Sequence, residues 1–293
     1  MKGKLFSKTV IRFFVYLFLF IFVVPLFFTY NLARPRAIRS DEHPLDYGWI
    51  YEDILIEKNN TPRLTGWFLP SLREDPSLTI ILLHGYPADK GDILHRAGYL
   101  LGDFNVVLFD FRYFGSSGGY YSTLGVKEKD DLSAVLDFLE EEKEITAVGL
   151  WGYSMGGAVA ILATPEEEMI KGIVVDSAYA NPKDMLKRIY YLPIVNEIFS
   201  EITLFSAGLI TRTNLKTTTP ESRMKDIRVP VFLIHPRHDP VIPFNQAEKL
   251  VKAVSDKIDI KIRFLDEEIH GIYDKDIFED IREFFLNIEK DLF

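Results

Sequence analysis

Short runs of apolar residues alternate along most of the chain with longer stretches of mixed polarity. Six runs are rich in Val, Ile and Leu: LTIILLHG, FNVVLFDFR, ITAVGLWG, KGIVVDSA, VPVFLIHP and DIKIRFLD. Continuous apolar runs of this length are typical of strands that are buried on both faces of a parallel sheet. The stretches between them, such as residues 128–141, have the spacing of helices. This alternation predicts βαβ units and a mostly parallel sheet flanked by helices.

Two further strand candidates, WIYEDILI and LTGWFLP, come before the alternating part and complete a set of eight. A turn signal, Asn-Asn-Thr-Pro at residues 59–62, separates them and predicts a leading pair of strands. One segment departs from this alternation of strands and helices, because residues 179–228 are far longer than a crossover between strands requires. This segment is rich in apolar residues. We therefore expect a helical lid over the carboxyl edge of the sheet, where ligands bind in open α/β sheets.

The N-terminal part of the chain differs in character from the rest. From Phe13 to Ala33 there is no charged residue, and most positions are Phe, Leu, Ile or Val. A helix of about 20 apolar residues spans a bilayer. The alternative is a cleaved signal peptide, but such peptides have a shorter apolar region and a small-residue cleavage site, and no Ala-x-Ala follows this run. We predict a transmembrane anchor over residues 1–33, a polar linker over 34–48 and one domain, lid included, over 49–293.

Charge bears on location and partners. Basic residues flank both ends of the apolar run: Lys2, Lys4, Lys8 and Arg12 before it, and Arg34, Arg36 and Arg39 after it. The positive-inside rule favours a cytoplasmic N-terminus, and hence a single-pass protein of the cell membrane with its domain outside the cytoplasm. The absence of cysteine agrees with either side. The net charge of −9 argues against a nucleic-acid partner.

One serine stands at an abrupt boundary between a strand-like and a helix-like run, in AVGLWGYSMGGAVAIL. Residues 152–156, Gly-Tyr-Ser-Met-Gly, fit the G-x-S-x-G pattern, in which a strained turn exposes a nucleophilic serine. Side chains two positions either way from Ser154 would collide with neighbouring backbone, which explains both glycines. The alternative to a nucleophilic serine is that the glycines serve only close packing of the strand and the helix and that the serine has no catalytic role. The chain has neither G-x-G-x-x-G nor a Gly-Lys-Ser/Thr phosphate loop.

A serine hydroxyl needs a base, and the base needs an orienting acid. Of the six histidines, only His270, in a loop after the last strand, is late enough for the order serine, acid, histidine. For the acid, Asp239 closely follows a buried strand and lies between prolines that stiffen its loop. Asp176 and Asp266 are competitors, although Asp266 is close in sequence to the base. A metal reading of His235-x-x-His238-Asp is weak, because no H-E-x-x-H or comparable ligand set is present, and we predict no metal and no cofactor.

The oxyanion of an acyl-transfer intermediate needs two donors. The N–H of Met155, next after the serine at the start of the helix, supplies one. The N–H of Tyr86, in LLHGYPADKGD, is the second candidate. We expect the side chain of His84 in the same segment to be structural, buried and hydrogen-bonded to backbone under the loop.

These motifs together resemble the α/β-hydrolase superfamily of serine hydrolases, from about Trp49 to the C-terminus. The landmarks, in the family's order, are LTGWFLP, ILLHGYPADKGD, VVLFDFRYFGSSGG, STLGVKEKDDLSAVLDFL, VGLWGYSMGGAVA, VVDSAY and HPRHDPVIPFNQAEKL. The set is most similar to esterase- or lipase-like members with an N-terminal membrane helix. The resemblance implies the α/β-hydrolase fold, a triad of Ser154, Asp239 and His270, and an oxyanion hole from the N–H groups of Tyr86 and Met155.

The leading hypothesis is a membrane-anchored serine hydrolase that cleaves carboxylic esters through an acyl-enzyme. The apolar lid and the nearby bilayer favour a fatty or otherwise apolar acyl group, so the expected partners are a small-molecule ester, with lipids among the candidates, and the membrane. A thioesterase, amidase or peptidase with the same triad is the alternative within enzymes. A membrane-tethered binding protein that keeps the fold without activity is the alternative outside them.

Overall fold

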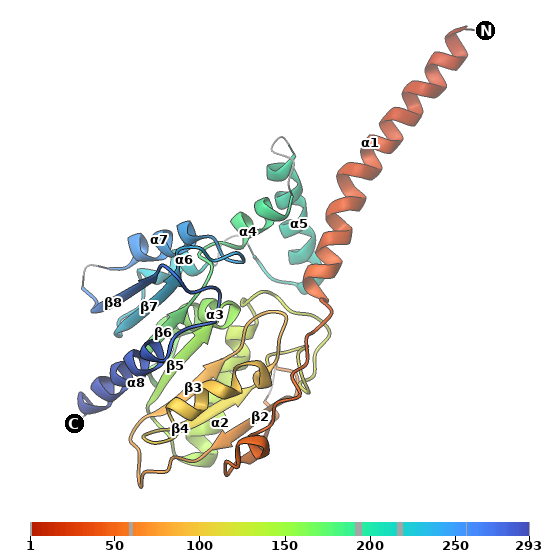
Figure 1. Cartoon of the computed structure of the whole chain (residues 1–293). Coiled ribbons are helices and arrows are strands. Elements are labelled where there is room, and N and C mark those ends of the chain that lie inside the picture. Colours follow the sequence, from red (N-terminus) through yellow and green to blue (C-terminus); the bar gives the residue numbers. More distant parts are fainter. Residues whose placement is uncertain (1, 59–60, 191–194, 216–218, 256, 293) are drawn as a thin grey trace.

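A computed structural model describes residues 2–58, 61–190, 195–215, 219–255 and 257–292 (Figure 1). At its centre is an eight-stranded sheet in the order β1-β2-β4-β3-β5-β6-β7-β8. The strands are β1 (Glu52–Ile56), β2 (Leu64–Leu69), β3 (Thr79–Leu83), β4 (Asn105–Phe109), β5 (Val148–Tyr153), β6 (Ile170–Asp176), β7 (Val231–Pro236) and β8 (Ile260–Leu265). The pairs β1–β2 and β2–β4 are antiparallel and all the others are parallel, so the mostly parallel eight-stranded sheet is confirmed. Of the turn expected at residues 59–62, positions 59 and 60 lie outside the described residues.

Burial along the strands explains the apolar runs. Strands β3 and β7 are buried at every position, since helices cover both faces of the sheet there. Strand β8 is an exception, because it lies at the edge of the sheet and most of its side chains are exposed or half-buried. Its run therefore includes Lys261 and Arg263, as is common on edge strands.

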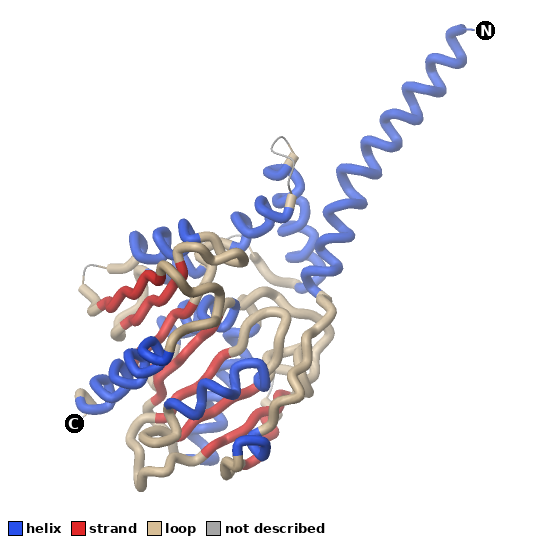
Figure 2. The backbone as a smooth tube through the Cα atoms, viewed as in Figure 1, coloured by secondary structure: helices blue, strands red, loops and turns tan. Residues whose placement is uncertain are grey.

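Two layers of helices cover the sheet (Figure 2). The α-helices are α1 (Lys2–Ala33), α2 (Glu128–Lys143), α3 (Met155–Ala163), α4 (Pro182–Ile189), α5 (Asn196–Thr211), α6 (Pro220–Met224), α7 (Phe244–Ala253) and α8 (Lys275–Lys290), and the 3₁₀ segments are η1 (Pro44–Tyr47), η2 (Lys90–Tyr99) and η3 (Thr164–Glu166). Helices α2, α3 and α7 pack on one face, in a core that includes Leu132, Val159 and Leu250. Segment η2 and helix α8 pack on the other face around Leu94 and Phe285.

The segment between β6 and β7, where the helical lid is expected, contains α4, α5 and α6 within its described residues. Positions 191–194 and 216–218 of this segment lie outside them. Helix α6 packs on α3 and α7, whereas α4 and α5 form an arm that stands beside the part of α1 nearest the sheet (Figure 1). Tyr190 and Phe199 of the arm share an apolar cluster with Phe28 of α1.

Within the described part of the chain, α1 is the one helix long and apolar enough to cross a membrane, over Lys8–Ala33, with a mean hydropathy of 2.6. The residues after it, expected as a linker, lie against the domain. The N–H of Ile38 donates to the carbonyl of Pro87 at 2.7 Å. Ser40 packs closely on Gly91, because a Cβ added to Gly91 would lie 2.8 Å from the Cβ of Ser40. The exit of α1 is therefore fixed to the loop after β3.

Candidate active site

The serine of the G-x-S-x-G motif lies where β5 ends and α3 begins. Ser154 has φ 53° and ψ −113°, a backbone conformation that residues other than glycine rarely adopt. Such conformations often mark functional sites. A Cβ at Gly152 would lie 2.3 Å from the carbonyl oxygen of Gly156, and a Cβ at Gly156 would lie 2.1 Å from that of Leu83. Only glycine fits at either position, so the strained corner requires both glycines.

The loops after β7 and β8 bring a carboxylate and an imidazole together. Asp239 Oδ2 lies 2.6 Å from His270 Nδ1. Asp239 Oδ1 accepts the N–H groups of Val241 at 2.7 Å and Ile242 at 2.8 Å, so its own loop fixes the carboxylate. Burial acts to raise the pKa of Asp239, but the hydrogen bond and charge of His270 and the two N–H groups outweigh it and lower that pKa below its usual value. An ionised Asp239 keeps a proton on Nδ1 of His270 and leaves Nε2 as the basic nitrogen.

The loop that carries His270 packs against the residue before the serine. The ring of Tyr153 lies 5.0 Å from the imidazole, centroid to centroid, and its hydroxyl donates to the carbonyl of His270 at 3.5 Å. A Cβ at Gly271 would lie 2.5 Å from the same hydroxyl. The structure thus brings the loop of the Asp239–His270 pair against Tyr153, the residue before Ser154, at the carboxyl edge of the sheet.

The two competing acids have other partners. Asp176 is fully buried and lies 2.7 Å from Arg96 Nη1, and its Oδ1 accepts the hydroxyl of Tyr273. Asp266 is exposed and pairs with Arg237 at 3.0 Å. Within the described residues neither carboxylate bonds His270, so of the three carboxylates Asp239 is the one that orients the imidazole.

The loop after β3 lies beside the serine. A Cβ at Gly85 would be 3.3 Å from the Cβ of Ser154. Across the described ranges, the backbone N–H groups of the two candidate oxyanion donors, Tyr86 and Met155, have no backbone acceptor. His84 beneath them is fully buried, its Nε2 accepts the N–H of Phe111 at 3.0 Å, and its Nδ1 therefore donates to the carbonyl of Gly85 at 2.8 Å. Burial lowers the pKa of His84, which keeps it neutral in this structural role.

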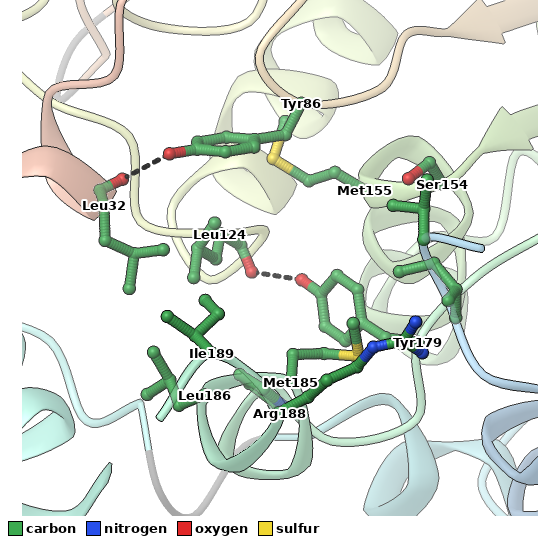
Figure 3. A pocket seen from close by; sticks show the side chains of 13 residues that line it. Leu32, Tyr86, Leu124, Ser154, Met155, Tyr179, Met185, Leu186, Arg188 and Ile189 are labelled. Atoms are coloured by element: carbon green, nitrogen blue, oxygen red, sulfur yellow. Dashed lines mark hydrogen bonds between the residues drawn. The ribbon is translucent and has the colours of Figure 1, made fainter. Parts of the chain in front are cut away.

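Ser154 is 7% exposed and faces a cavity of about 390 Å³ (Figure 3). Most of the cavity wall is apolar and comes from α4, from the loop after β7 and from the last turn of α1, through Leu186, Ile189, Val241, Ile242 and Leu32. Sequence reasoning missed Leu32, because nothing in a membrane-helix pattern indicates contact with a pocket. The hydroxyl of Tyr86 donates to the carbonyl of Leu32 at 3.1 Å, so α1 is joined to the candidate oxyanion loop.

No three side chains of His, Cys, Asp or Glu in the described residues are close enough together to hold a metal ion. The cavity is instead lined by a strained serine and by Tyr86 and Met155, and the oriented imidazole of His270 lies against Tyr153, the residue before that serine. This set is suited to nucleophilic attack on a carbonyl carbon and to stabilisation of the resulting oxyanion.

Comparisons with known proteins agree with the fold. A family model described as alpha/beta hydrolase fold matches residues 79–199. The chain is 28% identical over 246 residues to the uncharacterized protein YfhR of Escherichia coli K12, covering 79% of this chain and 80% of that one. It is 27% identical over 214 residues to the mouse lysophosphatidylserine lipase ABHD12, covering 68% of this chain and 51% of the mouse protein. The structure of the Pyrococcus furiosus esterase Pf2001 superposes with a TM-score of 0.70 at 25% identity, covering 86% of this chain and 98% of the esterase.

The chain has the α/β-hydrolase fold, as its motifs, its sheet and these matches agree. Within that class it is a hydrolase whose relatives include an esterase and lipases.

Proposed function

We propose that the protein is a membrane-anchored serine hydrolase that cleaves carboxylic esters with an apolar acyl group. The observation that carries the proposal is the 2.6 Å contact between Asp239 and His270, in a loop that packs on the residue before a strained Ser154. Acyl transfer requires a nucleophile, a base and an orienting acid, and these three residues supply the matching groups in the proposal.

In the proposed reaction, the Ser154 hydroxyl attacks the ester carbonyl while its proton passes to Nε2 of His270. Asp239 holds the imidazole in the required tautomer and stabilises the imidazolium that forms. The N–H groups of Tyr86 and Met155 bind the oxyanion, and the loss of one such donor typically costs about 10²–10³ in rate. The tetrahedral intermediate collapses as the leaving alcohol takes the proton from His270. Water activated by the same imidazole then hydrolyses the acyl-enzyme and restores the serine.

The apolar cavity wall supports an apolar acyl group, because a buried chain gains about 0.8 kcal/mol for each CH₂ removed from water. The names of two relatives, an esterase and a lysophosphatidylserine lipase, point in the same direction. Helix α1 would hold the domain at the membrane. The basic residues before α1 favour a cytoplasmic N-terminus and a domain outside the cytoplasm. The chain has no cysteine, so an impermeant thiol reagent applied to intact cells that carry Leu72→Cys would report the side directly.

Labelling by a fluorophosphonate tests the serine nucleophile. We expect the wild-type chain to be labelled, Ser154→Ala not to be labelled, and Ser133→Ala, a control on α2 away from the cavity, to be labelled as the wild type. An unlabelled wild type would contradict the proposed chemistry and favour a binding protein of the same fold.

A panel of esters with increasing acyl length tests the substrate class. We expect kcat/KM to rise with chain length until the cavity is filled. A flat response across all esters, together with hydrolysis of thioesters or amides, would move the assignment to those substrates.

A further inference from the structure

Helix α5 has three faces with different surroundings, and the first packs on α1. The rings of Phe199 and Phe20 lie 5.2 Å apart, and the hydroxyl of Thr29 donates to the carbonyl of Thr203 at 3.3 Å. Ile210 shares a small hollow with the end of α1. Contacts at both ends of α5 therefore hold it alongside α1, with both helices running toward the sheet (Figure 1).

The second face of α5 carries its charges, and these are paired. Glu197 pairs with Lys183 and, at 2.5 Å, with Lys187 of α4, and Glu201 pairs with Lys183 at 2.5 Å. Both acidic residues of α5 are thus neutralised by lysines of α4. Charges that compensate one another lower the cost of placing this arm near lipid.

The third face is an uncovered apolar stripe. Ile198, Ile202, Phe205 and Leu209 follow one another at spacings of four, three and four residues, which puts them on one side of the helix. Ile198 is 53% exposed, Phe205 60% and Leu209 66%. Soluble surfaces rarely expose contiguous apolar side chains in this way unless something binds there.

The length of α1 decides what covers the stripe. Residues 8–19 of α1 lie beyond the contact between Phe20 and Phe199 and extend only about 18 Å, at about 1.5 Å per residue. The hydrocarbon core of a bilayer is about 30 Å thick. If α1 spans the bilayer, about 12 Å of that core must surround the part of α1 that α5 flanks. The outer part of α5 then lies at the same depth as hydrocarbon.

A group of side chains typical of the membrane–water interface lies at the ends of α1 and α5 that are nearest the sheet. Tyr30, Arg34, Tyr120 and Tyr121 line one hollow together with Ile210, at the sheet-proximal ends of α1 and α5. Tyrosine is enriched at the membrane–water interface, and arginine near helix ends reaches to it. This group lies where the headgroups of the near leaflet would be.

We propose that α5 is a second membrane element, with its apolar stripe in the near leaflet of the bilayer that α1 spans, and that the cavity of Ser154 opens to this leaflet. Leu32 of α1 and Leu186 and Ile189 of α4 form the side of the cavity across from Ser154 (Figure 3). Ile189 is also 46% exposed. An amphiphile can therefore pass its acyl chain from the leaflet to the serine between α1 and α4. This last step rests on the proposed ester hydrolysis, whereas the depth of α5 does not.

The depth of α5 is measured first, in the full chain. Because the chain has no cysteine, Phe205→Cys and Leu72→Cys each accept a single environment-sensitive fluorophore. Leu72 is the control, since it is 83% exposed in the loop between β2 and β3. In vesicles of phosphatidylcholine and phosphatidylglycerol with bromine on the acyl chains, we expect strong quenching and a blue shift at position 205 and neither at position 72. Equal quenching at the two positions would overturn the proposal.

Activity then tests the opening to the leaflet. Phe205→Glu combined with Leu209→Glu places two charges in the stripe, away from the cavity. We expect hydrolysis of a long-chain ester embedded in the same vesicles to fall about tenfold or more, because charges at lipid depth are strongly disfavoured. Hydrolysis of a short, water-soluble ester should stay within about twofold, since the serine and its partners are untouched.

Matched controls separate the possible failures. Ile50→Glu combined with Leu72→Glu makes the same chemical change at two exposed positions of the domain and should affect neither substrate. Wild-type rates on both substrates in the stripe variant, or an equal loss on both, would overturn the opening to the leaflet. A wild-type chain that hydrolyses neither ester would sink the proposed function, while the quenching result would still decide the depth of α5.

Discussion

An ion pair between Arg96 and Asp176 lies beneath the candidate active site, and its removal should weaken both the fold and the site. Arg96 is 2% exposed, and its Nη1 lies 2.7 Å from Oδ2 of the fully buried Asp176. The same carboxylate accepts the hydroxyl of Tyr273 and, at 3.4 Å, the indole N–H of Trp151. Tyr273 follows His270 closely in the same loop, so the ion pair also helps to fix the loop of the base.

Replacing Arg96 with Met leaves the Asp176 carboxylate buried without its cation. Removal of one partner from a buried ion pair costs about 3–5 kcal/mol. The guanidinium also stacks over the ring of Trp151 at 5.0 Å and that of Tyr153 at 4.5 Å, and such contacts contribute about 0.5–2 kcal/mol each. Because methionine retains part of this packing, we expect the free energy of unfolding to fall by about 4 kcal/mol.

Unfolding by urea in detergent, followed by circular dichroism, measures this loss independently of the nearby tryptophan. The control is Arg282→Met, which removes a more exposed pair with Asp103 and should cost about 0–1 kcal/mol. Adding Asp176→Leu to Arg96→Met should recover part of the loss, since an apolar pair replaces a lone buried charge. A loss for Arg96→Met no larger than that of the control would refute the reasoning.

Three further predictions follow from the site. Asp239→Asn should lower kcat by about 10⁴-fold with little change in KM, because the imidazole loses the partner that holds its tautomer; ester hydrolysis measures this. Gly156→Ala should cost about 3 kcal/mol or more, because the new Cβ would lie 2.1 Å from a carbonyl oxygen and backbone yields less easily than the end of a flexible side chain; urea unfolding measures this. Burial lowers the pKa of His84 and of His235, so the unfolded chain binds more protons below about pH 6.5, and each histidine should remove up to about 1.4 kcal/mol of stability per pH unit as the pH falls; unfolding at pH 7 and pH 5.5 measures this.

Each of these predictions has a matched control. Asp266→Asn changes an exposed carboxylate near the base in sequence and should leave kcat unchanged. Gly102→Ala places a Cβ in open space and should be close to neutral. If His84→Gln shows the same loss of stability on acidification as the wild type, that histidine does not contribute to it. An active Asp239→Asn or a stable Gly156→Ala would contradict the geometry of the corner and its base.

The sequence by itself determined the features that depend on local sterics and on hydropathy. Continuous apolar runs specify strands buried on both faces, so the eight strands and their mostly parallel arrangement could be predicted. The glycines around Ser154 make the corner recognisable, because the backbone of Gly156 and of Leu83 leaves no room for a Cβ at Gly152 and at Gly156 respectively. The uncharged stretch up to Ala33 specifies a long apolar helix for the same local reason.

Only the tertiary structure decided which distant groups meet. The sequence left Asp176 beside Asp239 as a partner for His270, and the choice depends on how three separate loops fold over the edge of the sheet. It gave no sign that Leu32 borders the cavity of Ser154, or that α5 keeps an apolar stripe uncovered beside α1. Periodicity reports the burial of each residue in its own element, whereas contacts between elements depend on packing and loop conformation, which no local pattern encodes.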